Sequence, residues 1–569
     1  MQTPSRAEAW AALETIGTAD GFDVLVIGGG ATGLGVAVDA AARGFRVALV
    51  EAVDFGKGTS SRSTKLVHGG VRYLAQGRIG LVREALAERA SLLGNAPHLA
   101  SALPFVMPAR GLVDRLFYGT GLRLYGALAG SRNLGPTEGL SAAQTAAALP
   151  GLSPSVHAGG VRYWDAQFDD ARLAVALART AVSLGAVVLN HAPVVGLLHG
   201  VGAEVLDRET GRVTTVRARC VINATGVWVD ALRQMDAQHA TPDHAAGEGT
   251  SIPASAKRMV TPSQGVHLVV DASFLGGHHA LLVPRTSDGR VVFAVPWLGH
   301  VILGTTDTPR SDLPLEPLPL PEEVDFILRE AGRYLRRAPT AGDVKSVWVG
   351  LRPLVAEESG SARGEEGSRA DGSRTEAATG SISREHTVLV DPSGLITVTG
   401  GKWTTYRSMA EDVLEHAFNA ELLPRRAGGV TERLPLKGAV TGATTTTHHP
   451  RPISDPPGLH LYGAEAESVA ALPGADRWLW RHHAADREDS PFGLSEAMVR
   501  FAVRHEMART VEDVLARRSR LLFLDAARAA EVAPDVAALL SEELGDAPDA
   551  SGLQDFLALA RQYALLPQH

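Results

Sequence analysis

The stretch DVLVIGGGATGLGVAVDAAARGFRVALVE, residues 23–51, decides the fold of this chain. Its apolar run 24–27 predicts a buried parallel strand, and an alanine-rich helix follows the strand and stops at Gly44. A second apolar strand, 47–50, leads directly into Glu51. Three glycines stand between the first strand and the helix in G-x-G-x-x-G spacing: Gly28, Gly30 and Gly33. This order of strand, glycines, helix, strand and acid predicts a βαβ unit that binds a dinucleotide.

Each part of this pattern has a physical role. The first glycine allows a tight turn, the second lets a pyrophosphate approach the backbone, and the third packs the helix against the strand. The helix N-terminus offers unpaired N–H groups and the positive end of a dipole to the phosphates. Glu51 lies at the right distance to accept a hydrogen bond from a ribose hydroxyl. A glycine-rich turn of another α/β domain is disfavoured because all five features agree, but the pattern alone does not separate NAD from FAD.

The length and composition limit the class of protein. A chain of 569 residues is too long for one core, so we expect two or three domains. The hydrophobic content of 45% and charged content of 21% are ordinary for a globular protein, and the net charge of −8 argues against a nucleic-acid partner. The single cysteine, Cys220, excludes an internal disulfide, suits a reducing cytoplasm and is expected to be buried in a strand. No run of about 18 apolar residues predicts a membrane span.

Two further segments extend the predicted dinucleotide site. GKGTSSRSTKLVHGGVRYL, residues 56–74, is rich in hydroxyls, glycines and cations directly after the second strand. We expect it to wrap the pyrophosphate and to reach towards a reactive ring, although a solvated loop is the simpler alternative. The apolar strand in 216–223 ends in Ala-Thr-Gly, with the glycine at Gly226, a pattern that recurs in flavoproteins and closes the second approach to the dinucleotide.

The middle of the chain predicts a second layer of structure. Residues 258–310 alternate apolar and polar positions, which predicts a sheet with a hairpin turn at 287–289, and 347–355 is another strand. Segment 162–197 predicts a turn, a long helix capped by Asp169 and Asp170, and a strand. Segment 112–128 mixes Leu, Phe and Tyr with arginines, which predicts a core helix, with a helix on a membrane surface as the alternative.

The C-terminal third changes character. Residues 356–380 carry almost no side chain large enough for a core and predict a mobile insertion. Strand, glycine-pair and helix signals return over 382–417, and a Pro/Thr/His-rich connector then leads to repeated helical spacing over 495–530. We therefore divide the chain into a unit built on the dinucleotide-binding fingerprint, 20–428, and a C-terminal helical domain, 429–569.

Taken together, these motifs resemble FAD-dependent glycerol-3-phosphate dehydrogenases. The resemblance covers almost the whole chain in the same order, and VRHEMARTVEDVLARRSRLLFLD (503–525) resembles the C-terminal helical domain of that family. The other segments that carry it are SSRSTKLVHGGVRYL (60–74), GVHLVV (265–270), LGTTD (303–307), GLRPL (350–354), SREH (383–386) and GGKWTTYR (400–407). The resemblance implies an α/β fold: a Rossmann-type FAD-binding domain, an antiparallel-sheet substrate domain like that of D-amino-acid oxidase, and an all-helical C-terminal domain. It implies that the first unit, 20–428, is an FAD-dependent oxidoreductase.

The resemblance also implies an activity and a set of site residues. The activity is oxidation of sn-glycerol 3-phosphate to dihydroxyacetone phosphate, with electrons passing from FAD to a membrane quinone. Expected catalytic residues are His267, Arg352 and Lys402, and expected substrate-binding residues are Arg72, Tyr73 and Arg384. Expected FAD-binding residues are Gly28, Gly29, Gly30, Thr32, Gly33, Glu51, Thr59, Ser60, Ser61, Gly226, Asp307, Gly401 and Thr404. We expect no metal site, because the histidine pairs lack supporting ligands.

Chemistry supports these assignments. Several cations from separate segments suit a phosphate dianion, and guanidinium groups bind it in two-point fashion, although each arginine taken alone could form a surface ion pair. His267 is our candidate general base, because an unperturbed histidine pKa of about 6.5 lies near neutral pH, and a hydrogen-bonded sheet histidine is the alternative. Lys402 or Arg352 could instead polarise the C2 oxygen.

Three departures and two rival functions remain open. The chain has Gln264 and Trp403 where the family commonly has Lys and Leu, and the insertion at 356–380 is unusual for the dehydrogenases. A glycerol-3-phosphate oxidase that reduces O2 shares the fold, and such insertions occur among those oxidases. A flavin-binding sensor or structural subunit without catalysis is a different class, against which the retained cations argue.

The expected location in the cell follows from the electron acceptor, because a quinone of this kind lies in the membrane. We expect a cytoplasmic protein attached peripherally to the inner face of the cell membrane, and a homodimer is possible. Arginines beside apolar residues could touch anionic lipid, or could belong to an ordinary helix face: Arg517, Arg518 and Arg520.

Overall fold

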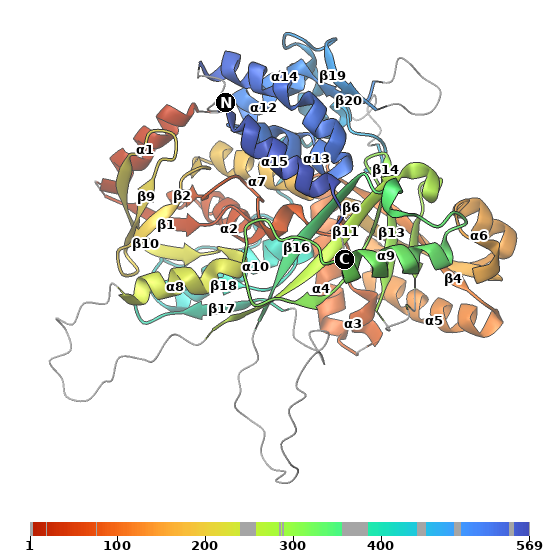
Figure 1. The fold of residues 1–569 in the computed structure, drawn as a ribbon. Helices are drawn as coiled ribbons and strands as arrows, with labels where there is room; N and C mark the ends of the chain where they lie inside the picture. The colour runs from red at the N-terminus through yellow and green to blue at the C-terminus, as the bar shows by residue number, and fades with distance from the viewer. Residues whose placement is uncertain are drawn as a thin grey trace, which may run out of the picture.

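The computed structural model describes residues 4–18, 20–75, 77–238, 258–283, 286, 290–355, 385–440, 451–482, 491–545 and 551–567. The predicted insertion at 356–380 and the predicted turn at 287–289 lie outside this described part of the chain. Figure 1 shows two sheets side by side, with the C-terminal helices above both of them.

The first sheet is the predicted Rossmann sheet. Its strands follow the order β17-β18-β10-β1-β2-β7, and the pairs from β18 to β7 are all parallel. The strands are β1 (Phe22–Ile27), β2 (Val47–Val50), β7 (Val187–Leu189), β10 (Val213–Asn223), β17 (Thr387–Val390) and β18 (Ile396–Thr399). Both faces are covered, which explains why β2 and β7 are continuously apolar, whereas the first part of β10 alternates exposed and buried positions. The predicted βαβ unit is therefore confirmed.

Helices and a hairpin cover the two faces of this sheet. One face packs against α2 (Ala31–Ala42), α7 (Asp170–Ser183) and α10 (Tyr406–Asn419). The other face packs against α1 (Arg6–Thr18), α8 (Val229–Gln238) and the hairpin β8 (Val194–Leu197) and β9 (Gly202–Leu206). Cys220 is buried in β10, as predicted, and Asp169 caps α7 by accepting from the Arg172 N–H at 3.2 Å.

The second sheet is mostly antiparallel, as expected, and is called the substrate sheet below after the role that the resemblance implies. Its order is β15-β11-β14-β13-β12-β4-β6-β3, with β16 beside β11 and β5 beside β6. Its strands are β3 (Leu66–Val67), β4 (Ala100–Ala109), β5 (Glu138–Ser141), β6 (Gly159–Phe168), β11 (Val260–Asp271), β12 (Ala280–Val283), β13 (Val292–Trp297), β14 (His300–Gly304), β15 (Thr308–Pro309) and β16 (Ser346–Val355). Among these pairs only β12 and β4 run parallel. The turn expected at the start of segment 162–197 is wrong, because residues 162–168 continue β6, where pairing with β4 overrides the local sequence signal.

Helices border this sheet on several sides. The amphipathic helix α9 (Pro321–Tyr334) packs against β11, β13 and β14. The remaining helices of this half are α3 (Val71–Ala75), α4 (Ile79–Asn95), α5 (Leu112–Ala129) and α6 (Ala142–Ala148). The expectation that 112–128 is a core helix is wrong for one face of α5. Leu122 and Tyr125 are buried, whereas Val113 and Phe117 are 81% and 72% exposed.

The C-terminal part is mainly helical. Its helices are α11 (Ala466–Ala470), α12 (Glu496–Glu506), the π-helix η11 (Asp513–Arg518), α13 (Leu521–Leu524), α14 (Ala526–Leu544) and α15 (Leu553–Ala564). It also contains a short hairpin, β19 (Trp478–Arg481) with β20 (Gly493–Ser495), which the expectation of an all-helical domain missed. Its apolar residues share one continuous core with the second sheet, including Trp348 of β16 and Phe523 of α13. This shared core fixes the helices against the substrate sheet.

Candidate active site

Most of the predicted cofactor residues lie in loops at the carboxyl edge of the first sheet. Ile27 of β1 lies in register with Val50 of β2 and Asn223 of β10, so the loops after these strands are neighbours. In open α/β sheets, ligands bind at this edge. The Gly28 N–H donates to the Val50 carbonyl at 2.9 Å, and the Thr399 hydroxyl of β18 donates to the Gly226 carbonyl at 3.2 Å.

The glycines at this edge are required by close approach. Gly28 has a φ of +112°, and a Cβ on it would lie 2.6 Å from the Ala224 carbonyl oxygen. A Cβ on Gly33 would lie 2.0 Å from the Gly28 oxygen. Gly226 differs, because a Cβ there would meet no atom within 4 Å although the residue lies between two packed elements. The carboxyl edge of the sheet is therefore closely packed at Gly28 and Gly33, where α2 meets β1, and has free space at Gly226, where a ligand would lie.

Gly33→Ala is expected to abolish FAD loading. The added methyl group cannot fit beside the Gly28 carbonyl, so the loop that faces the pyrophosphate must shift. The ratio of flavin to protein absorbance in purified protein measures the effect. Gly80→Ala in α4 is the matched control, because a Cβ there meets nothing within 4 Å and alanine favours a helix by about 1 kcal/mol. Equal flavin content in both variants would contradict the assignment.

Glu51 is held at the end of β2 by backbone groups. Its carboxylate accepts from the Gly29 N–H at 2.6 Å and from the Val53 N–H at 2.9 Å. Burial raises the pKa of this carboxyl, and the two N–H groups oppose the shift. The acid is thereby fixed beside the glycine turn, where the fingerprint places a ribose contact.

The predicted hydroxyl loop joins the two sheets. It forms the short helix η1 (Thr59–Ser61), and the Ser60 hydroxyl accepts from the N–H of Ala31 in the first turn of α2 at 2.9 Å. Thr59 donates to the Leu351 carbonyl of β16, and the Trp403 indole donates to the Ser60 carbonyl at 2.7 Å. The Thr404 hydroxyl donates to the His68 carbonyl at 3.5 Å. The loop is therefore a junction between the helix N-terminus and the substrate sheet.

Arg352 is held in a fixed orientation on β16. One guanidinium nitrogen donates to the Gln264 carbonyl at 3.2 Å, and the other donates to the Thr306 carbonyl at 2.9 Å. It also pairs with Asp307 at 3.3 Å, so this predicted cofactor residue lies on the substrate sheet. A Cβ on Gly265 would lie 2.3 Å from the guanidinium, which explains the glycine opposite it.

His267 is buried on β11, in register with Trp348 of β16. Its imidazole stacks on the Trp348 ring with a centroid distance of 4.1 Å, and Nε2 lies 2.9 Å from the Thr64 hydroxyl. Nδ1 is buried and has no hydrogen-bond partner among the described residues. Burial, and then Lys65 and Arg352, hold the pKa of the imidazole well below its ordinary value. The expectation of an unperturbed pKa is therefore wrong, and the ring is neutral at neutral pH.

Lys402 contacts Tyr73, a residue near the C-terminal end of the hydroxyl loop 56–74. The Lys402 ammonium lies 4.0 Å from the centroid of the Tyr73 ring. Lys402 directly precedes η8 (Trp403–Thr405), and Gly401 before it has a φ of +74°. Arg72 lies in α3 next to Tyr73, and Arg384 lies outside the described residues. Thr32 lies in the first turn of α2.

One buried cation was missed by sequence reasoning. Lys65 is fully buried, and its ammonium donates to the Ser61 carbonyl at 2.6 Å and pairs with Asp170 at 2.7 Å. Its place inside the hydroxyl loop 56–74, and inside the quoted family segment 60–74, was the available signal. Arg520 also pairs with Asp170, at 3.1 Å, and is fully buried.

Of the two alternatives for the C-terminal arginines, the structure contradicts the contact with lipid. Arg517 and Arg518 are buried and pair with Asp54, which follows β2. Arg520 donates to the Ser61 carbonyl at 2.9 Å. These side chains therefore tie the C-terminal helices to the cofactor loops, which a linear sequence cannot reveal.

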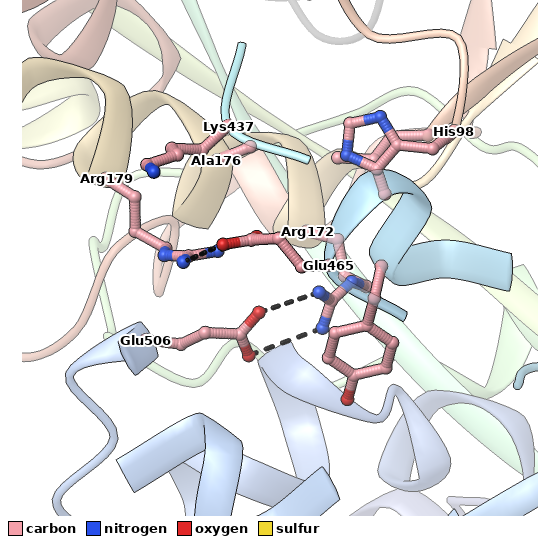
Figure 2. Close-up of a pocket in the computed structure, with 9 residues that line it drawn as sticks. His98, Arg172, Ala176, Arg179, Lys437, Glu465 and Glu506 are labelled. Carbon is pink, nitrogen blue, oxygen red and sulfur yellow. Dashed lines mark hydrogen bonds and ion pairs between the residues drawn. The ribbon is translucent and has the colours of Figure 1, made fainter. Parts of the chain in front are cut away.

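A small cavity between α7 and the C-terminal part is separate from these residues. Figure 2 shows that two ion pairs line it, Arg172 with Glu506 at 2.7 Å and Arg179 with Glu465 at 2.6 Å. Its volume of about 10 Å³ suffices for one water molecule. The two ion pairs join α7 to the C-terminal part, and the cavity between them leaves no room for a substrate.

The edge residues fit an FAD molecule. The N-terminus of α2, the open space at Gly226 and the fixed Glu51 would hold its phosphates and ribose, and the unpartnered Nδ1 of His267 marks a polar position in the substrate sheet. The fold and the site thus define an FAD-dependent oxidoreductase, and FAD is its cofactor.

Comparisons with known proteins narrow the class. Residues 23–407 match the family model "FAD dependent oxidoreductase", and residues 429–550 match "C-terminal domain of alpha-glycerophosphate oxidase". The chain is 38% identical to a mitochondrial glycerol-3-phosphate dehydrogenase of Arabidopsis thaliana, over 95% of this chain and 86% of that protein. It is 39% identical to that of Homo sapiens, over 95% and 73%.

A solved structure agrees with these matches. The glycerol-3-phosphate dehydrogenase of Bacillus halodurans, complexed with FAD, superposes with a TM-score of 0.71 at 27% identity, covering 100% of this chain and 99% of that one. The chain belongs to the FAD-dependent glycerol-3-phosphate dehydrogenase family.

Proposed function

We propose that this chain oxidises sn-glycerol 3-phosphate to dihydroxyacetone phosphate and passes the electrons to a membrane quinone. The observation that supports the reaction best is the neutral, buried His267 on β11 together with the oriented Arg352 guanidinium on β16, the strand that pairs with β11 and contacts the hydroxyl loop. The names of the relatives support the same substrate.

The side chains can divide the work of alcohol oxidation. FAD, when bound, supplies the acceptor for the hydride on C2. His267 would take the hydroxyl proton, since its imidazole is neutral and its buried Nδ1 has no hydrogen-bond partner among the described residues. Arg352 would lower the pKa of the C2 hydroxyl, and Lys402 would attract the phosphate dianion in a chain that is otherwise acidic. A bound dianion would also favour the imidazolium that forms.

Anaerobic bleaching tests the proposed reaction. Adding glycerol 3-phosphate to the yellow protein under nitrogen should remove the flavin absorbance near 450 nm, in the region typical of oxidised flavins. A flavin that stays oxidised with this substrate would reject the enzyme and favour a non-catalytic flavoprotein. Glycerol without phosphate is the matched control for the role of the cations.

The acceptor has a second candidate. The match of residues 429–550 to a model named after alpha-glycerophosphate oxidase supports O2 as an alternative to quinone. Aerobic turnover with a peroxide assay, compared with turnover on a soluble quinone, separates the two. Stoichiometric peroxide without quinone would replace the dehydrogenase proposal by an oxidase.

We propose that α5 attaches the protein to the inner face of the cell membrane. Its exposed stripe carries large apolar side chains: Leu112, Val113, Leu116, Phe117 and Leu124. Exposed cations stand beside the stripe at Arg110, Arg123 and Arg132, which suits an anionic bilayer. Figure 1 shows α5 at an outer edge of the substrate half. No described helix combines the length and apolarity of a membrane span.

Phe117→Glu is expected to weaken binding to vesicles that contain phosphatidylglycerol by about tenfold or more, because a buried phenyl ring contributes roughly 2 kcal/mol. Flotation with phosphatidylglycerol vesicles measures the effect. Val201→Glu, at a residue 58% exposed near the β8–β9 hairpin, is the matched control. Equal flotation of both variants would remove α5 as the contact.

A further inference from the structure

Lys65 is an unusual residue for the interior. Its side chain is 0% exposed, and its backbone has a left-handed φ of +62°. Burial lowers the pKa of its ammonium to about 7, and the neighbouring Asp170 opposes that shift. A buried lysine with these costs calls for a functional reason, because an apolar residue would fit a core more easily.

Aromatic rings surround this ammonium. It lies 4.5 Å from the Trp348 ring centroid, 5.3 Å from that of Trp297 and 5.4 Å from that of Phe523. The Trp348 ring in turn stacks on His267. The residue before Lys65 is Thr64, whose hydroxyl contacts Nε2 of His267. Lys65 is therefore linked to His267 by two chains of contacts. One runs through the Trp348 indole, and the other runs through the neighbouring residue Thr64.

We propose that Lys65 is a positioning residue that keeps the His267 imidazole neutral and correctly oriented, acting through Trp348 and Thr64. This inference rests on the proposed function, in which His267 takes the substrate proton. It adds a residue that does not touch the reacting atoms.

The charges around His267 agree with an effect of Lys65 that favours the neutral imidazole. Lys65 and Arg352 act on His267 as nearby cations and disfavour a second positive charge on it. Lys65 itself faces Asp170 of α7, and Arg520 faces both Asp170 and Asp169, at 3.1 and 3.4 Å. The lysine is charged below about pH 7, which is the range in which His267 would otherwise be protonated.

Lys65→Gln tests the proposal. A glutamine amide can still donate to the Ser61 carbonyl and to Asp170, so the substitution removes the charge and keeps polar contacts. The acid limb of the pH profile of kcat/KM for flavin reduction is expected to move up by about one pH unit. Lys65→Arg, which keeps the charge, should retain the wild-type limb. An unchanged limb in Lys65→Gln, with activity lost equally at every pH, would overturn the proposal.

A spectroscopic measurement keeps the test decisive if the variants do not load FAD. The 13Cε1 signal of His267 in wild-type holoenzyme is assigned by its absence from His267→Gln and is expected not to titrate between pH 6 and 8. A midpoint within that range would overturn the proposal. If His267→Gln bleaches with substrate as fast as wild type, the proton-transfer role fails instead. The effect of Lys65 is then decided by comparing the His267 signal of Lys65→Gln with that of wild type, and an identical titration in both would overturn the proposal.

Discussion

Replacing His267 by glutamine is expected to slow anaerobic flavin reduction by glycerol 3-phosphate at least about 100-fold, the low end for loss of a general base. Glutamine can keep the contact to the Thr64 hydroxyl and fill most of the space on Trp348, but its amide cannot take a proton. FAD content should remain normal, because the residue lies on the substrate sheet. Stopped-flow absorbance near 450 nm, in the range typical of flavins, measures the rate.

A second buried histidine supplies the control. His300 lies on β14 of the same sheet, is 6% exposed, and has its pKa lowered to about 4 by burial. Its Nδ1 lies 3.2 Å from the Leu298 carbonyl, so it is a hydrogen-bonded sheet histidine. His300→Gln should reduce flavin at a rate close to wild type. Equal rates in both variants would assign His267 the same structural role as His300.

Asp54→Asn is expected to destabilise the protein by about 3 to 5 kcal/mol, the cost of breaking a buried ion pair and leaving charge behind. Asp54 is fully buried and pairs with both Arg517 and Arg518, and its other oxygen accepts from the Asn190 amide at 2.9 Å. In the variant, two buried guanidinium groups lose their shared carboxylate. Far-UV circular dichroism and flavin fluorescence during urea unfolding measure the loss.

An exposed ion pair is the matched control. Arg528 and Glu531 are 57% and 58% exposed in α14, and such a pair contributes at most about 1 kcal/mol. Glu531→Gln should therefore leave the unfolding midpoint almost unchanged. If Asp54→Asn also leaves it unchanged, the network does not hold the C-terminal helices on the cofactor loops.

Much of the cofactor site could be predicted from the sequence because it is local. The turn at Gly28, the packing at Gly33 and the acid at Glu51 all lie within one βαβ unit, in which spacing along the chain sets spacing in space. The exposed stripe of α5 was harder to predict, since a helical apolar pattern does not say which face a neighbouring element covers.

The substrate side depended on the resemblance to a family. Nothing in the sequence itself brings His267 of β11 beside Trp348 of β16 or Lys65 before β3, because strand pairing across long stretches of chain decides these contacts. For the same reason, the unperturbed pKa expected for His267 was wrong: burial and cations from other segments set it.

By itself, the sequence determined a dinucleotide-binding βαβ unit, because its strands, turn glycines and acid act within about thirty residues and follow local rules. Only the tertiary structure decided where the charged side chains lie and which groups they pair with. It placed Arg517, Arg518 and Arg520 in the interior, where they bind carboxylates and carbonyls of the cofactor half, and it buried Lys65 behind the ring that supports His267. Burying a charged side chain costs free energy unless an oppositely charged or hydrogen-bonding group pairs with it. Here those groups are distant in the sequence, and only folding brings them together.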